Sequence, residues 1–130
     1  MLKLEVVTPD RTFLKTEVKS ATVPGVMGEF GILPGHTPVL SLLKPGVVTI
    51  DENGTTKQFM VAEGFVEVRD DAVNIICDVA RDRSEIIAQD EEGIQQELKN
   101  KMASLRVEDQ EFQHLSRELE KSVVSLSLLK

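Results

Sequence analysis

Two histidines, one cysteine and the acidic side chains are the residues of this sequence that could do chemistry. His36 and His114 stand alone, and neither belongs to a His-x-x-x-His pair of the kind that binds zinc. Cys77 lies in the apolar run 73–77, which is typical of a core thiol in a reducing compartment. The motifs Gly-x-Ser-x-Gly and Gly-x-x-x-x-Gly-Lys are missing, so neither a nucleophile elbow nor a phosphate loop is indicated. We therefore expect no catalytic residue, no metal and no cofactor.

The segment 23–38 is the one stretch whose composition suggests a site. Its glycines and prolines surround a small apolar group, and we expect an irregular loop that presents Glu29 and His36. On composition alone two interpretations stay open: a turn between two strands, or a rigid loop that contacts a partner. A third, weaker hypothesis is an enzyme that uses His36 together with Glu29.

The elements that must position this segment are strands. Short runs rich in β-branched residues, separated by Pro, Gly, Asn and Asp, predict an antiparallel sandwich or flattened barrel up to about residue 80. The dipeptide Asn53-Gly54 predicts a tight hairpin. The expected strands are 6–8, 18–23, 39–43, 47–50, 59–62, 65–68 and 73–79.

After about residue 83 the apolar period becomes helical. A first stripe consists of Ile87, Ile94, Leu98, Met102 and Leu105, and a second of Phe112, Leu115, Leu119, Val123 and Leu126. Ser84 and Asp109 are the expected N-caps, and 106–109 the turn between the helices. The sequence thus predicts a β-sandwich domain over 1–82 and a C-terminal α-helical hairpin over 83–130.

The overall charge argues against some partners. The net charge is −7 and the chain has five Phe but no Trp or Tyr, which disfavours a nucleic-acid surface. No apolar run approaches the ~20 residues that span a bilayer, so we expect no direct membrane insertion and any membrane association to come through partners.

The segment 28–38 carries a family resemblance. Its sequence, Gly-Glu-Phe-Gly-Ile-Leu-Pro-Gly-His-Thr-Pro, resembles the Gly-Glu-x-Gly-Ile-x-Pro-Gly-His-x-Pro signature of the epsilon subunit of bacterial-type rotary ATP synthases. The opening 6–11 and the segments 43–46, 64–68 and 78–80 are also similar to that family, in order and in register. The resemblance covers essentially the whole chain.

The resemblance implies a non-catalytic subunit of the central stalk that links the gamma subunit to the membrane ring of c subunits and so couples proton flow to ATP synthesis. It implies that Glu29 and His36 contact the c ring, and that Gly28 and Gly31 meet backbone requirements of the loop. It also implies that the helical hairpin extends to reach the catalytic alpha and beta subunits and restrains ATP hydrolysis. Arg117 and Lys121 are then the candidates to contact an acidic segment of the catalytic beta subunit.

The sequence departs from the family at one motif. Some members bind ATP through Ile/Leu-Asp-x-x-Arg-Ala at the start of the first helix, whereas residues 86–91 here read Ile-Ile-Ala-Gln-Asp-Glu. Ile87 stands for the Asp and Asp90 for the Arg, which reverses the charge that would face a phosphate. We therefore expect no ATP binding of that kind.

One rival function and one location complete the expectations. The rival is a free-standing β-sandwich that binds another protein and has no rotor role. The N-terminal residues lack the features of a signal or transit peptide. We therefore expect a peripheral protein on the cytoplasmic face of a bacterial cell membrane.

Overall fold

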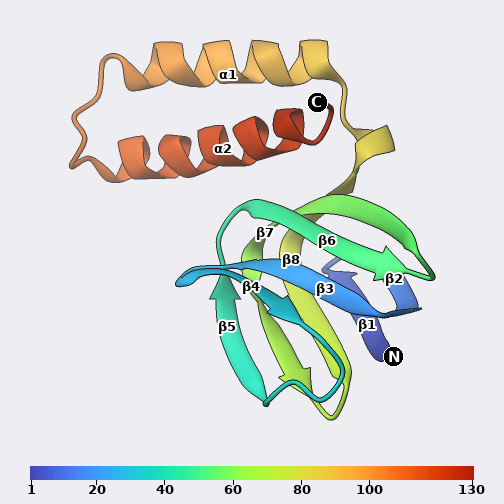
Figure 1. The fold of residues 1–130 in the computed structure, drawn as a ribbon. Coiled ribbons are helices and arrows are strands. Elements are labelled where there is room, and N and C mark those ends of the chain that lie inside the picture. Colours follow the sequence, from blue (N-terminus) through green and yellow to red (C-terminus); the bar gives the residue numbers. More distant parts are fainter. The chain divides into compact units, whose positions relative to one another are not determined.

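The computed structural model describes all 130 residues, which form two compact units, Met1–Asp82 and Arg83–Lys130. Strands build the first unit and helices the second (Figure 1). The strands are β1 (Leu2–Thr8), β2 (Arg11–Val18), β3 (Ser20–Gly25), β4 (Gly28–Ile32), β5 (Val39–Leu43), β6 (Gly46–Glu52), β7 (Thr55–Arg69) and β8 (Ala72–Asp82). The expected fold class, a β-sandwich followed by a helical hairpin, is confirmed.

The eight strands form one sheet that folds back on itself. Its order is β2-β1-β8-β7-β5-β3-β4, and β6 pairs with both β3 and β7. All neighbours are antiparallel except β1 and β8, which run parallel. A side-chain hydrogen bond connects the edge strand β2 to β6: the Thr16 hydroxyl donates to Glu52 Oε2 at 2.7 Å. Hydrogen bonds from Lys57 and then from Thr16 lower the pKa of Glu52.

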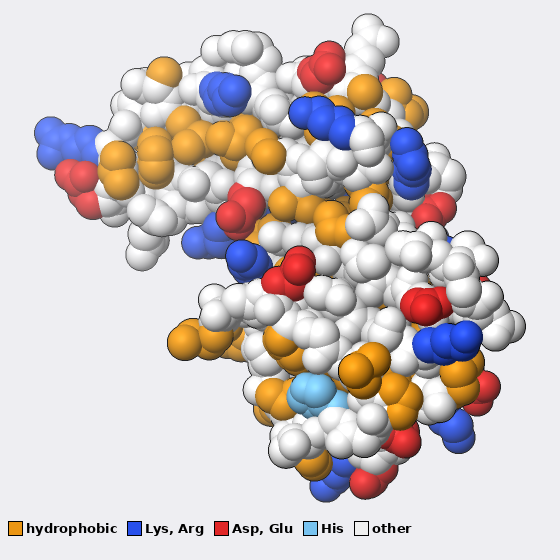
Figure 2. Space-filling view, in the orientation of Figure 1, with side chains coloured by type: hydrophobic (Ala, Val, Ile, Leu, Met, Phe, Trp, Pro, Cys, Tyr) orange, Lys and Arg blue, Asp and Glu red, His pale blue; other side chains and the backbone are white.

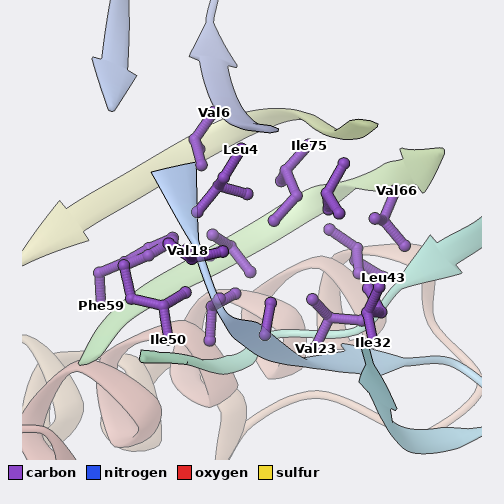
Figure 3. Close-up of a cluster of buried hydrophobic side chains, with 14 of the residues drawn as sticks. Leu4, Val6, Val18, Val23, Ile32, Leu43, Ile50, Phe59, Val66 and Ile75 are labelled. Atoms are coloured by element: carbon purple, nitrogen blue, oxygen red, sulfur yellow. The ribbon is translucent and has the colours of Figure 1, made fainter. Parts of the chain in front are cut away.

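The core lies between the two layers of this sheet. Figure 3 shows Leu4, Val66 and Ile75 pointing toward Val23 and Ile32, and all five side chains are at most 1% exposed. Each side chain buried in this way contributes about 1.5–3 kcal/mol to the free energy of folding. Every residue of the cluster belongs to the first unit, so the sandwich has a hydrophobic core of its own.

The predicted hairpin at Asn53-Gly54 is confirmed. These two residues connect β6 to β7, whose last pair is Glu52 with Thr55. Both have positive φ, 55° for Asn53 and 85° for Gly54, as a two-residue turn matching the strand twist requires.

Three strand expectations were wrong. The segment 28–32 is not part of an irregular loop but strand β4, so only the turn at 26–27 and residues 33–38 lie outside strands in the segment 23–38. The expected strand 18–23 contains the end of β2 and most of β3, and β2 was missed because its mostly half-exposed and polar residues show little apolar alternation. Finally, 59–62 and 65–68 belong to one continuous strand, β7.

The middle of β7 is where that strand departs from regular geometry. Glu63 has a φ of 61°, a conformation that costs most side chains energy, and it lies between the paired residues Ala62 and Gly64 of β7. Gly64 follows, and a Cβ at this position would lie 2.0 Å from the Ile76 carbonyl oxygen and 2.5 Å from Cys77 Cα. Glycine is therefore the residue that lets β7 and β8 approach each other here.

The second unit consists of a 3-10 turn and two helices that pack on each other, α1 (Ala88–Met102) and α2 (Gln110–Ser127) (Figure 1). Ser84 is not the N-cap, because it lies in the 3-10 turn Arg83–Glu85 and α1 begins later, after Ile87. Asp109 does occupy the N-cap position of α2, although its carboxylate accepts from the Arg106 backbone N–H at 3.0 Å and makes no cap bond.

The seam between α1 and α2 is more polar than the two predicted stripes. On α1 the buried residue is Glu91, whereas Ile87 and Ile94 are 60% and 44% exposed. On α2 the buried residues are Leu115, Ser122 and Ser125, whereas Val123 is 49% exposed. Contrary to the prediction, Ile87, Ile94 and Val123 are therefore not part of buried stripes.

Hydrogen bonds replace part of the expected apolar packing in this seam. The Ser122 hydroxyl donates to the Glu91 carbonyl oxygen at 3.3 Å, and the Arg83 guanidinium donates to the Leu129 carbonyl oxygen at 3.2 Å. Gln95 Nε2 is buried without an acceptor. Because buried serines remove less apolar area from water than leucines, the seam holds the hairpin together less strongly than two apolar stripes would.

The close approach at Gly64 gives a stability prediction. Gly64→Ala forces a methyl group into the backbone of β8, so we expect a loss of about 3 kcal/mol or more in the free energy of unfolding of the sandwich. Gly31→Ala is the matched control, since its Cβ would meet nothing within 4 Å, and we expect a change within about 0.5 kcal/mol. Urea unfolding of both variants measures the difference. Equal midpoints for Gly64→Ala and the unaltered chain would contradict the packing described here.

Candidate functional site

Strand β4 and the irregular residues that follow it present the predicted site residues at one edge of the sandwich. Val26 and Met27 form the turn between β3 and β4. Along β4 the exposed Glu29 alternates with the half-buried Phe30, and the strand ends at the fully buried Ile32. Glu29 therefore stands on the solvent face of the strand and has no hydrogen-bond or ion-pair partner within the chain.

His36 follows a turn that fixes its position. Its backbone N–H donates to the Leu33 carbonyl oxygen at 3.1 Å, and its Nδ1 lies 2.6 Å from the Thr37 carbonyl oxygen. The tautomer with the proton on Nδ1 satisfies that contact and leaves Nε2 as an acceptor. The ring lies beside Phe30, with 6.2 Å between the ring centroids. No hydrogen bond or ion pair joins His36 to Glu29, so the acid–base pair of the enzyme hypothesis is not assembled.

A neighbouring turn holds this loop in place. The backbone N–H of Gly35 donates to Asp71 Oδ1 at 2.8 Å. Asp71 and Asp70 form the turn between β7 and β8, with φ of 62° and 50°. The sequence did not predict this anchor, because nothing local in it links Asp71 to a residue 36 positions away.

The two predicted loop glycines differ. Gly28 has a φ of 133°, in the region that favours glycine, so its residue type follows from the turn. Gly31 has no positive φ, and an added Cβ would meet nothing within 4 Å. Nothing within the chain therefore explains why residue 31 is a glycine.

A second surface, which sequence reasoning missed, crosses the outer face of the sheet. Leu42 on β5 is paired with Phe65 on β7, Phe65 with Ile76 on β8, and Ile76 with Val7 on β1. Directly paired residues point to the same side of a sheet, so these four side chains form one apolar row. Leu42 and Ile76 are 64% and 45% exposed. We call these four residues the apolar row.

A shallow depression of about 320 Å³ lies over part of the apolar row. Val7, Phe65 and Ile76 line it, together with the acidic residues Glu63 and Asp78. A continuous exposed apolar surface of this kind on a small protein commonly marks a contact with another protein. In the sequence, each of the four strands has an apolar residue at an outward position. These residues can be recognised as one row only when the strand pairing is known.

The two basic residues predicted on α2 are in different situations. Arg117 is exposed, whereas the Lys121 side chain is only 13% exposed and its Nζ lies 2.8 Å from Glu118 Oε1. Lys121 thus has its charge paired on the same helix, and Arg117 is the more accessible cation.

The remaining polar and reactive side chains do not assemble into a site of chemistry. No group of three or more His, Cys, Asp and Glu side chains is arranged to hold a metal ion. Neither helix combines the length and the apolar character that a bilayer crossing demands. Cys77 is a 2% exposed member of the core, which confirms its expected structural role, and burial followed by the nearby Asp78 charge raises its pKa to about 11.

The structure is thus a small β-sandwich followed by a helical hairpin, and the sandwich carries an exposed apolar row and an exposed polar strand edge. A family model described as ATP synthase, Delta/Epsilon chain, beta-sandwich domain matches residues 1–83. The ATP synthase epsilon chain of Myxococcus xanthus is 38% identical over 112 residues, which are 86% of this chain and 82% of that one. That of Citrifermentans bemidjiense is 31% identical over 127 residues, covering 98% of this chain and 92% of that one.

Solved structures agree with these relatives. A chain in the Euglena gracilis mitochondrial ATP synthase structure of OSCP, F1 and c-ring superposes with a TM-score of 0.85 and 26% identity, over 99% of this chain and 81% of that one. A chain of the Tetrahymena thermophila mitochondrial ATP synthase, at 14% identity and a TM-score of 0.67 over 99% of this chain and 96% of that one, shares the fold. This chain belongs to the ATP synthase delta/epsilon family, and its relatives named above are epsilon chains.

The raised pKa of Cys77 gives a prediction for its thiol. In the folded chain the pKa of about 11 exceeds the ordinary value of 9.0, so the folded state holds the proton where the unfolded state loses it. We expect the stability of the unaltered chain, relative to Cys77→Ala, to be constant below about pH 9 and to fall as the pH rises toward 11. Unfolding midpoints of both chains across that range measure this. Rapid reaction of the native thiol with a disulfide reagent at pH 8 would contradict the burial.

Proposed function

We propose that this chain is a rotor subunit of the central stalk of an ATP synthase, where it links the gamma subunit to the c ring and contributes no catalytic residue. The observation that carries the proposal is that this chain is similar to epsilon chains along both the sandwich and the hairpin. Relatives match up to 98% of the chain, and the Euglena chain that superposes on 99% of it comes from an assembly containing a c-ring. Coupling of proton translocation to ATP synthesis is then mechanical, because torque passes through bound surfaces.

The two exposed surfaces suit two different partners. When a partner covers the apolar row, a contiguous hydrophobic area is removed from water, which favours a long-lived contact. We therefore assign the apolar row to the contact with gamma. The polar edge with Glu29 and His36 suits the c ring, since an exposed carboxylate orients a partner more than it adds affinity. The anchor from Gly35 to Asp71 keeps His36 in a fixed position relative to the sheet.

The hairpin is the part that we assign to restraining ATP hydrolysis. Its exposed Ile87 and Ile94 offer apolar contacts to a second surface, and a row of hydrophobic side chains runs along the hairpin (Figure 2). The polar seam lowers the cost of rearranging the two helices, as a two-state element requires. In an extended hairpin Arg117 is the residue best placed to contact an acidic segment of a catalytic beta subunit, with Lys121 available once it leaves Glu118.

The proposed function also implies a cellular location. As a subunit of an ATP synthase whose named relatives are bacterial, the chain would sit peripherally on the cytoplasmic face of the cell membrane, held there by gamma and the c ring. Neither ATP nor another cofactor is assigned to it.

The first test is ATP hydrolysis by a catalytic sector that lacks this subunit. We expect the full chain to bind and slow hydrolysis, and the chain truncated after Asp82 to bind without slowing it, since the sandwich has its own core. Steady-state hydrolysis during titration of each form measures this. If both forms bind and neither inhibits, the hairpin has no regulatory role. If neither binds, the rotor proposal fails and a free-standing binding module becomes the better reading.

The second test separates the apolar row from the rest of the sheet. Ile76→Lys places a charge in the row, and we expect affinity for gamma in the catalytic sector to fall at least about tenfold because a buried apolar contact is lost and a cation is desolvated. Asn74→Lys, two residues away on the same face of β8, is the control and should bind like the unaltered chain. Equal affinities for both variants, measured with labelled chain, would show that gamma binds elsewhere.

A further inference from the structure

Strand β4 is an edge of the sheet with no second neighbour. It pairs with β3 alone, at the end of the strand order. Edge strands leave alternate backbone N–H and C=O groups without partners, and proteins commonly cover or block them. In β4 the only charged side chain is Glu29, and there is no proline.

The pairing of β3 shows which backbone groups of β4 are open. The Pro24 carbonyl oxygen accepts from the Lys44 N–H at 3.0 Å, on the side of β3 that faces β5. Pro24 has no N–H, so it makes no bond to its β4 partner Glu29. Because hydrogen-bonded and non-bonded pairs alternate along antiparallel strands, Gly31, two residues further, is also non-bonded to β3.

The backbone groups of Glu29 and Gly31 therefore point away from the sheet. Two N–H donors and two C=O acceptors form a short open ladder, and no other backbone segment bonds to them. At Gly31 no side chain shields this ladder, although neither space nor φ within the chain demands a glycine there. A strand glycine without an internal reason is typical of a place where another backbone approaches closely.

The side chains around the ladder indicate what approaches it. Glu29 carries the only charge, is exposed, and has no basic partner in the chain. Met27 and Leu33, at the two ends of β4, are 96% and 63% exposed. The complement is a short extended segment with a basic side chain between apolar ones. A second copy of this chain fits poorly, since pairing two such edges brings Glu29 carboxylates together in a protein of net charge −7.

We propose that the β4 edge binds its partner by main-chain pairing, receiving a short extended segment whose basic side chain faces Glu29. Resting on the proposed function, this inference assigns the segment to the polar loop of a c subunit. Affinity then comes from backbone hydrogen bonds at Glu29 and Gly31, and orientation from the Glu29 carboxylate. The contact tolerates variation in the partner's side chains because the backbone groups carry it.

The experiment compares single-residue variants on two forms of the enzyme, both depleted of this subunit: the complete synthase and the catalytic sector without the c ring. Gly31→Pro deletes one outward N–H and leaves the bonds to β3 in place. We expect its affinity for the complete synthase to fall about threefold to tenfold, with affinity for the catalytic sector unchanged. Gly31→Ala keeps the donor and adds only a methyl group, so we expect its affinity for the complete synthase to fall less than that of Gly31→Pro, with affinity for the catalytic sector unchanged.

A second measurement does not depend on how the variants fold. Hydrogen exchange of the peptide covering 28–32 should be fast at Glu29 and Gly31 in the free chain and protected in the complete synthase. Glu29→Gln should keep the two amides protected from exchange in the complete synthase. Its affinity should be lower than that of the unaltered chain and should depend less on salt concentration, because the carboxylate charge is gone.

The outcomes separate this inference from the proposed function. If the chain joins the synthase while both amides exchange as fast as in the free chain, main-chain pairing is wrong and the rotor role stands. If the chain does not join either form, the rotor role itself fails. Protection in the free chain that grows with protein concentration would show that a second copy occupies the edge, which also overturns the assignment.

Discussion

The close approach of β7 to β8 at Gly64 is the constraint on which the rest of the sandwich depends. β7 is a 15-residue strand that pairs with β6 in its first half, with β5 in its second and with β8 along most of its length. The change of partner takes place around Glu63, whose φ of 61° departs from extended strand geometry, although the register with β8 is the same on both sides of it. Without a glycine next to it, the main chains of β7 and β8 could not stay in register, and neither the apolar row nor the turn that anchors Gly35 would be formed.

Two surfaces of opposite character follow from this arrangement. The apolar row needs four strands in register, so its shape is as rigid as the sheet. The β4 edge, by contrast, offers backbone groups and one carboxylate, which bind by directional hydrogen bonds and ion pairs more than by burial of apolar area. If the apolar row binds gamma and the β4 edge binds the c ring, as we propose, the two contacts are made by different physical means.

The order of strands and helices could be predicted from the sequence, whereas most of the contacts between them could not. Turn residues and apolar period located the sandwich, the Asn53-Gly54 hairpin and the two helices, because these are local signals. The helical stripes were partly wrong: Ile87 and Ile94 fit the period, yet Glu91 is buried, and periodicity alone does not show that serines line the opposite helix. The composition of segment 23–38 singled out Glu29 and His36, the resemblance assigned them to the c ring, and their role as contacts stays a prediction. Asp71 and the apolar row depend on long-range pairing and carried no local signal.

The polarity of the helical seam completes the physical argument. In a hairpin held by two leucine stripes, separation would expose a large apolar area and cost many kcal/mol, so one arrangement would dominate. Here Ser122 and Ser125 occupy buried positions on α2, Gln95 Nε2 lacks an acceptor, and apolar side chains such as Ile94 face outward. Water can satisfy these polar groups when the helices part, while the exposed apolar residues gain a surface to bury against. For the restraint of ATP hydrolysis that we propose, such a seam keeps the free-energy difference between two arrangements of the hairpin small.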